Sequence, residues 1–125
     1  MAILGSKELY VETIYILSMG SDKVRAKDIS SLLGFSRASV SRAVLSLKEK
    51  GLVRKDTNGN IKLTEGGLIL AKHIHERQTL VKDLLTGLGV SDDTASEEAS
   101  HIERFFSDET VEKIRLHLTR GPRQG

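Results

Sequence analysis

The chain has 125 residues, a net charge of +2 and no cysteine, which excludes disulfides, thiolate metal sites and cysteine nucleophiles. Its apolar content of 38%, with three Phe, two Tyr and no Trp, predicts a thin aliphatic core that borrows apolar surface from a partner subunit. No stretch approaches the roughly 20 apolar residues of a membrane span, so we expect a cytoplasmic protein that does not bind membranes.

The charge is distributed unevenly along the chain. Residues 22–62 carry ten Lys or Arg against four Asp or Glu, whereas residues 63–125 carry eight against eleven. A basic first half followed by an acidic second half suggests a polyanion-binding module attached to a second module.

Three helices are expected first. Ser6 can cap a helix that ends at Gly20, and a short helix over about residues 26–33 stops at Gly34 in a left-handed conformation. Ser36 then caps a helix that runs to about residue 50. The apolar residues expected to form the inward faces of these helices are Leu9, Tyr10, Ile14, Ile16, Leu17, Ile29, Leu32, Leu33, Val40, Val44 and Leu47.

A hairpin and three more helices are expected next. The turn residues 56–59 separate two short β-prone runs. Thr64 can cap a long helix through about residue 85, another helix covers about residues 92–106, and Ser107 caps the last one. The fold class is therefore mainly α: a winged helix-turn-helix DNA-binding domain at residues 1–63, followed by an all-helical dimerisation domain at residues 64–125.

The segment DISSLLGFSRASVSRAVLSLKEKGLV has the spacing of a helix-turn-helix. Gly34 makes the turn, small Ser30 permits close approach, and Val40 fills the gap between the two helices. The outer face of the third helix then carries hydroxyls and guanidiniums, which can bond phosphate oxygens or guanine in the major groove, although serines often only cap and solvate a helix. The candidate DNA-contacting residues are Arg25, Lys27, Ser36, Arg37, Ser39, Ser41, Arg42, Lys55 and Lys62.

With these elements placed, residues 6 to about 118 resemble the iron- and manganese-dependent repressors of the diphtheria-toxin-repressor and manganese-transport-regulator family. The segments that carry the resemblance are SKELYVETIY, VRAKDISSLLGFSRASVSRAVLSLKEKGLV, GNIKLTEGG, LLTGLGV and EEASHIERFFSDE. The resemblance implies a homodimer that reads a palindromic operator in double-stranded DNA, with manganese or iron as the cofactor.

The resemblance also implies six metal-ligand positions, and two of them, Glu12 and Glu103, keep a strong ligand. The other four positions hold Leu9, Gln78, Ser100 and Arg104, and a secondary metal site falls on Gln78, Lys82 and Ser96. Because Arg104 stays protonated and has no lone pair to donate, we expect the usual site to be altered or lost, and the chain to bind no metal there or bind it weakly.

Three interpretations of the second half stay open. Arg104 can pair with Glu12, and also with Glu103, as a built-in substitute for the ion. A relocated metal site can form from His75, Glu98 and His101. Alternatively, these polar side chains only cover a solvated helix face.

The candidate functions differ mainly in how the metal-ligand positions are interpreted. The sequence favours a repressor with an altered metal site. A metal-gated repressor with relocated ligands, a winged-helix regulator that answers a non-metal signal or none, and a module whose helix-turn-helix binds protein remain alternatives. No phosphate loop, nucleophile–base pair or HExxH motif is present, so we do not expect an enzyme.

Overall fold

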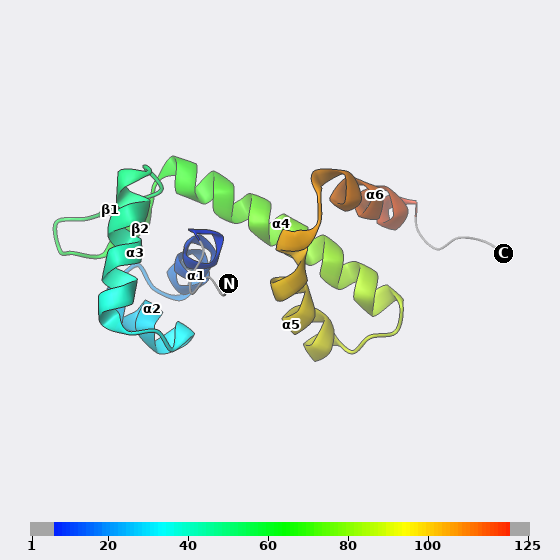
Figure 1. Ribbon diagram of the computed structural model, residues 1–125, viewed down its shortest axis with the longest axis horizontal. Helices are drawn as coiled ribbons and strands as arrows, with labels where there is room; N and C mark the ends of the chain where they lie inside the picture. Colours follow the sequence, from blue (N-terminus) through cyan, green and yellow to red (C-terminus); the bar gives the residue numbers. More distant parts are fainter. Residues whose placement is uncertain (1–6, 121–125) are drawn as a thin grey trace. The chain divides into compact units, whose positions relative to one another are not determined.

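The computed structural model describes residues 7–120, which fall into two compact units that meet between Ile74 and His75. The first unit holds α1 (Lys7–Gly20), α2 (Ala26–Leu33), α3 (Arg37–Glu49), β1 (Val53–Lys55) and β2 (Ile61–Leu63) (Figure 1). The chain passes into the second unit within α4 (Glu65–Gly87), and there follow α5 (Asp92–Ile102), the short 3-10 helix η1 (Glu103–Phe105) and α6 (Asp108–Thr119).

This element order confirms the predicted fold class, with a winged helix-turn-helix followed by helices. The predicted domain boundary between residues 63 and 64 stays a prediction, and the predicted cap Ser6 lies outside the described residues. No helix within residues 7–120 has the length and apolar character needed to cross a membrane.

The core of the first unit is aliphatic, as predicted, with Val11, Ile14, Ile29 and Val40 fully buried. Two residues expected on the inward faces are instead exposed: Ile16 by 48% and Leu32 by 55%. Ile16 lies two positions beyond Ile14, roughly 200° around the helix, so it cannot share its face. On the short α2, Ile29 and Leu33 contact the core one turn apart, and Leu32 lies beyond the edge of that contact.

The turn between α2 and α3 has the geometry that its glycine predicts. Gly34 has φ 74°, a left-handed conformation that costs other residues more, and its N–H donates to the Ser30 carbonyl at 2.8 Å. The Ser30 hydroxyl in turn donates to the carbonyl of Phe35 at 2.5 Å. Ser30 therefore ties both sides of the turn together, in addition to being small.

A second glycine, Gly67, allows the first turn of α4 to pack closely against Leu52, just before the hairpin. Strands β1 and β2 pair antiparallel with Val53 opposite Leu63. Thr64 caps α4 as predicted, because its Oγ1 accepts from the Gly67 N–H at 3.1 Å and donates to the Gly51 carbonyl at 2.6 Å. A Cβ at Gly67 would lie 2.0 Å from the Leu52 carbonyl oxygen, so this packing requires glycine in the first turn of the helix.

The second unit has a small core in which Val81, Ala99 and Ile114 are buried. The helix predicted over residues 92–106 is not continuous: α5 ends at Ile102 and the chain continues as η1. Phe106 then has extended backbone angles, φ −85° and ψ 138°. The physical reason lies in a buried guanidinium that takes up carbonyl groups of this segment, as described below.

Candidate functional site

The outer face of α3 presents polar and cationic side chains. Val40, Val44 and Leu47 face the core, whereas Arg37, Ser41 and Arg42 are exposed to solvent. Among the described residues, the Arg37 guanidinium has no hydrogen-bond or ion-pair partner, whereas Arg42 Nη2 lies 3.4 Å from the Ser39 hydroxyl. The structure therefore leaves Arg37, Ser41 and Arg42 exposed to solvent and Ser39 half-buried, and their contact with DNA stays a prediction.

The N-terminus of α3 adds hydrogen-bond donors to this surface. Ser36 caps the helix, and its Oγ accepts from the Ser39 N–H at 3.1 Å. A hollow of about 470 Å³ lies beside it, lined by Tyr10, Gly34, Phe35, Ser36, Ser39, Arg42 and Ala43. Hydroxyls, a guanidinium and the start of a helix are the groups that bind phosphate oxygens in nucleic-acid complexes.

Two predicted DNA-contacting cations also hold the wing. Arg25 Nη2 donates to the Asn58 carbonyl at 2.5 Å, and Lys62 Nζ donates to the Asp22 carbonyl at 2.7 Å. Lys27 and Lys55 are exposed. The structural role of Arg25 and Lys62 was missed from the sequence because their partners are 33 and 40 residues away along the chain.

The tip of the wing is organised by one carboxylate. Asp56 Oδ1 accepts from the backbone N–H groups of Asn58 and Asn60 at 2.8 and 2.9 Å, and Oδ2 accepts from the Asn60 side chain at 3.1 Å. These bonds, led by that from the Asn60 backbone N–H, lower the pKa of Asp56, with a further contribution from the nearby Lys62 charge. The wing therefore keeps its shape through bonds that are stronger when the Asp56 carboxylate is ionised.

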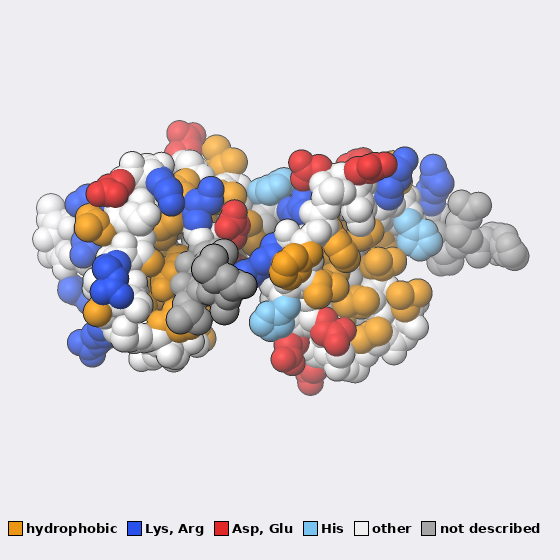
Figure 2. Space-filling model, in the orientation of Figure 1, with side chains coloured by type: hydrophobic (Ala, Val, Ile, Leu, Met, Phe, Trp, Pro, Cys, Tyr) orange, Lys and Arg blue, Asp and Glu red, His pale blue; other side chains and the backbone are white. Residues whose placement is uncertain are grey.

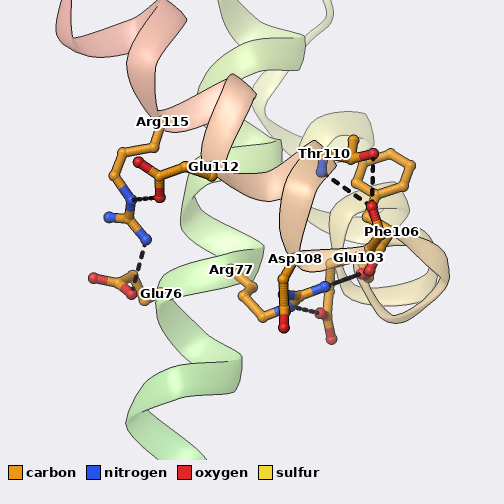
Figure 3. Close-up of polar contacts among 9 residues, drawn as sticks. Glu76, Arg77, Glu103, Phe106, Asp108, Thr110, Glu112 and Arg115 are labelled. Atoms are coloured by element: carbon orange, nitrogen blue, oxygen red, sulfur yellow. Dashed lines mark hydrogen bonds and ion pairs between the residues drawn. The ribbon is translucent and has the colours of Figure 1, made fainter.

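In the second unit, a buried arginine connects α4 to η1 and α6 (Figure 3). Arg77 is 9% exposed, and its Nε lies 3.2 Å from Oε2 of Glu103, which is 3% exposed. Nη2 donates to the carbonyls of Glu103 and Phe106 at 3.2 and 2.6 Å, and Nη1 lies 2.9 Å from Asp108 Oδ1. We call these residues the Arg77 clamp; its carbonyl bonds explain why α5 does not continue to Phe106.

Arg77 was not among the residues selected from the sequence. It lies in a mostly polar stretch of α4, HIHERQ, which is typical of a solvated helix face. The sequence carries one signal: a cation one position before Gln78, at the helix that the resemblance assigns to metal binding. The carboxylate that it contacts is 26 residues away, and only the fold shows that pairing.

The residues considered for metal binding are distributed over both units. Glu12, 9% exposed, lies on α1 in the first unit, whereas Glu103 and exposed Arg104 lie on η1 in the second. The Ser100 hydroxyl donates to the Glu97 carbonyl at 2.7 Å. The pairing of Arg104 with Glu12 therefore stays a prediction.

The relocated site has no preassembled form. Within residues 7–120, no group of three or more His, Asp or Glu side chains comes together in a way that could hold a metal ion. His75, Glu98 and His101 are therefore not such a group in this structure, and their role as ligands stays a prediction.

Large apolar side chains are exposed on the second unit. Phe105 is 81% exposed, Leu88 74% and Leu116 39%. In the face drawn in Figure 2, hydrophobic side chains gather on this unit. Exposed apolar surface of this kind is typical of an interface with another protein chain.

Two family profiles match the chain. The profile described as iron dependent repressor, N-terminal DNA binding domain, matches residues 3–59. The profile described as iron dependent repressor, metal binding and dimerisation domain, matches residues 64–121. The chain belongs to the iron-dependent repressor family. The resemblance predicted from the sequence is thereby confirmed, and the family is one of transcriptional regulators rather than enzymes.

Individual relatives agree with this membership. The chain is 30% identical over 115 residues to an uncharacterised HTH-type transcriptional regulator of Methanocaldococcus jannaschii, covering 90% of the chain and 92% of that protein. It is 33% identical over 107 residues to the transcriptional regulator MntR of Escherichia coli, covering 86% of the chain and 69% of MntR.

Solved structures show the same fold. The manganese regulator SloR matches with a TM-score of 0.77 at 33% identity, covering 91% of this chain and 54% of SloR. A manganese-dependent transcriptional repressor in complex with manganese matches with a TM-score of 0.84 at 27% identity, covering 95% of this chain and 55% of that protein. The chain thus spans about half the length of these two solved proteins.

Proposed function

We propose that the chain is a homodimeric transcriptional repressor that binds a palindromic operator in double-stranded DNA. The observation that carries the proposal is the surface of α3, where Arg37, Ser41 and Arg42 are exposed beside the Ser36 cap. The wing cations Lys55 and Lys62 follow in the same unit. Arg reads guanine in the major groove, and the wing cations contact the flanking phosphates.

Dimerisation through the second unit is part of the proposal. The buried core cluster of this unit is small, with Val81, Ala99 and Ile114, and the unit leaves Phe105 and Leu88 exposed. A two-fold partner covers such apolar surface. A symmetric pair can then present two copies of α3 about one DNA turn apart, roughly 34 Å, to the two halves of the operator.

We also propose that the metal site implied by the family is altered in this chain. The residues at the six positions do not fit manganese or iron, because only Glu12 and Glu103 offer carboxylates. Glu103 Oε2 already accepts from the Arg77 guanidinium, and the Ser100 hydroxyl is directed to a backbone carbonyl. A divalent ion at Glu103 would have to displace or repel a fixed positive charge.

In this proposal, Arg77 does structural work within the second unit without an ion. A guanidinium is permanently charged and presents several donors in a fixed fork, so one side chain can hold a carboxylate and two carbonyls together. The segment η1 is thereby held against α4 independently of any metal. Because this proposal places no ion at the family's metal site, DNA binding is expected to be largely insensitive to chelators.

The test measures duplex DNA binding by the purified full chain, with and without chelator, beside elemental analysis. The probes are DNA fragments from the promoter region of the gene that encodes the chain. Footprinting on the same fragments locates the operator. We expect salt-dependent binding that changes less than about twofold on adding EDTA or Mn²⁺. Binding that disappears with EDTA and returns with Mn²⁺ or Fe²⁺ would support a metal-gated repressor, with Glu98, His101 and His75 as the next ligands to substitute.

The salt dependence separates DNA binding from protein binding by the helix-turn-helix. Lys55→Ala removes one phosphate contact, so it should weaken all duplex sequences alike and lower the salt slope by about 1. Lys113→Ala, an exposed lysine on α6 in the second unit, is the matched control. Absence of salt-dependent binding to any duplex would favour a protein partner instead.

A further inference from the structure

The second unit contains a hollow that the proposed DNA and dimer surfaces do not use, and it includes Gln78, Lys82 and Ser96, to which the resemblance assigns a secondary metal site. Its volume is about 360 Å³, at the lower end of the range of small-molecule pockets and enough for roughly ten water molecules. It is formed by α4 and α5 and is lined by His75, Gln78, Thr79, Lys82, Asp83, Ser96 and Ala99. The α4 residues recur one turn apart and therefore share one helix face, while small Ala99, 1% exposed, leaves space on the α5 side.

One polar group of the lining is buried without a partner. The side-chain Nε2 of Gln78 is inaccessible to solvent and, among the described residues, has no hydrogen-bond acceptor. Buried donors in folded proteins are nearly always bonded, so an unpaired one calls for an explanation. Because this atom has almost no accessible surface, a ligand oxygen in the hollow would receive the missing bond after a rotation of the Gln78 amide.

The remaining lining favours an acceptor with negative charge. Lys82 contributes an ammonium, and Thr79 and Ser96 contribute hydroxyls, all of which can donate. Lys82 Nζ lies 3.7 Å from Oδ2 of Asp92, whose side chain is 81% exposed, so this loose pair leaves the ammonium free to turn to a ligand.

The same hollow is a poor binding site for a divalent cation. Asp83 is its one carboxylate, and that residue is exposed. Divalent ions need several oxygen or imidazole ligands without a competing ammonium nearby. His75, Gln78, Thr79 and Ser96 can each donate as well as accept a hydrogen bond, and Lys82, the only fixed positive charge of the lining, can only donate.

From this geometry we infer that the hollow between α4 and α5 binds a small anionic metabolite through a carboxylate or phosphate group. Gln78 Nε2 and Lys82 Nζ donate to its oxygens, and the hydroxyls of Thr79 and Ser96 complete the cradle. The site gives the regulator an effector pocket made from its own residues, and this effector role rests on the proposed function. Binding itself is independent of DNA and can be measured alone.

The test is a titration of the ¹⁵N-labelled full chain with inorganic phosphate and, separately, with succinate, followed by NMR. Sodium chloride at matched ionic strength is the reference titration. We expect saturable shifts in the side-chain amide of Gln78 and in the backbone amides of Thr79 and Ser96. Saturation by phosphate alone identifies a phosphoryl ligand, and saturation by succinate alone identifies a carboxylate ligand.

Matched variants make the assignment specific. Lys82→Met removes the charge and Gln78→Glu replaces the donor by a carboxylate, and each should weaken binding at least tenfold. Lys82→Arg keeps a cation and should retain binding. Lys113→Met removes an exposed lysine of the same unit that does not line the hollow, so it should change affinity less than twofold.

Three outcomes would overturn the inference. They are the absence of saturable shifts at the Gln78 amide with either anion, equal weakening by Lys113→Met, and saturation of the hollow by Mn²⁺ instead of the anions. Duplex DNA binding measured on the same samples separates the two proposals. If DNA binding persists while anion binding fails, the pocket is rejected and the regulator stands; if DNA binding also fails, the proposed function falls with it.

Discussion

Arg37 and Arg42 in the first unit and Arg77 in the second unit have opposite surroundings. In the first unit, Arg37 and Arg42 stand exposed on α3, and only Arg42 approaches a neighbouring hydroxyl. In the second unit, Arg77 is 9% exposed and contacts a buried carboxylate, an exposed carboxylate and two carbonyls. The guanidiniums of Arg37 and Arg42 are thus left available to a partner, whereas Arg77 uses most of its donors inside the second unit.

This contrast separates arginines that can bind a partner from an arginine that stabilises the fold. Exposed guanidiniums contribute little to folding because water already solvates them, but they keep their donors for phosphate and guanine. A buried guanidinium must keep its partners, because a stranded charge is costly. We therefore expect substitutions in the two units to affect different measurements.

The largest effect is expected for Arg77→Met, which keeps an unbranched stem but removes the charge. Glu103 then remains buried without its cation, so the free energy of unfolding should fall by about 3–5 kcal/mol. Urea denaturation followed by circular dichroism at fixed protein concentration measures this. Adding Glu103→Gln should recover part of the loss, because the stranded charge is removed.

The matched control for this prediction is Arg115→Met on α6. Arg115 also contacts two carboxylates, Glu76 and Glu112, each at 3.2 Å, but this pairing is solvated. It should change stability much less than Arg77→Met. Equal losses for the two variants would show that burial of the clamp contributes nothing and would remove the distinction between the units.

The converse prediction concerns the double variant Arg37→Ala, Arg42→Ala. Each base-reading arginine should contribute about 1–3 kcal/mol to DNA binding and to discrimination at one base position. Stability should hardly change, because neither guanidinium holds the fold. Fluorescence anisotropy with the operator duplex at fixed salt measures the affinity, and Lys113→Ala is the control. Unchanged affinity in the double variant would reject α3 as the reading helix.

A smaller effect on stability is expected when the two adjacent glycines of α4 are replaced by alanine, and it should differ between them. Gly67→Ala should destabilise the protein by about 1–3 kcal/mol, because its Cβ would lie 2.0 Å from the Leu52 carbonyl oxygen. At Gly66 the nearest atom would be 3.7 Å away, an ordinary contact. Gly66→Ala should therefore be neutral or stabilising by up to about 1 kcal/mol through helix propensity. The same urea denaturation compares them, and equal effects would contradict close packing of α4 on Leu52.

The smallest expected effect is a pH dependence confined to the wing. The pKa of Asp56 is lowered in the folded protein, so its contribution to wing stability is complete above the ordinary carboxyl range, near pH 4, and is lost as the pH falls through the lower folded value. NMR shifts of the Asn58 and Asn60 amides should report this loss. In Asp56→Asn the same amides should show no titration in that range; an unchanged titration would assign it to another group.

Local patterns in the sequence predicted much of the fold. Gly34 and Ser36 stop and start helices through bonds to residues within five positions, and Thr64 and Ser107 cap in the same local way. The helix-turn-helix and its exposed cations follow from such spacing together with local charge. These features depend on neighbours along the chain, so the sequence contains the information directly.

Only the tertiary structure revealed the partners of residues far apart. Nothing near Arg77 in the sequence indicates Glu103, 26 positions away, and nothing near Gly67 indicates the Leu52 carbonyl. The periodicity of α1 likewise could not show where the core ends, so Ile16 was assigned to the inside. Arg77 stabilises the fold, and Gly67 is required, because of the atoms that folding brings against them. Short-range spacing determined the helices and strands. Long-range packing determined which of their side chains stay exposed and available to a partner.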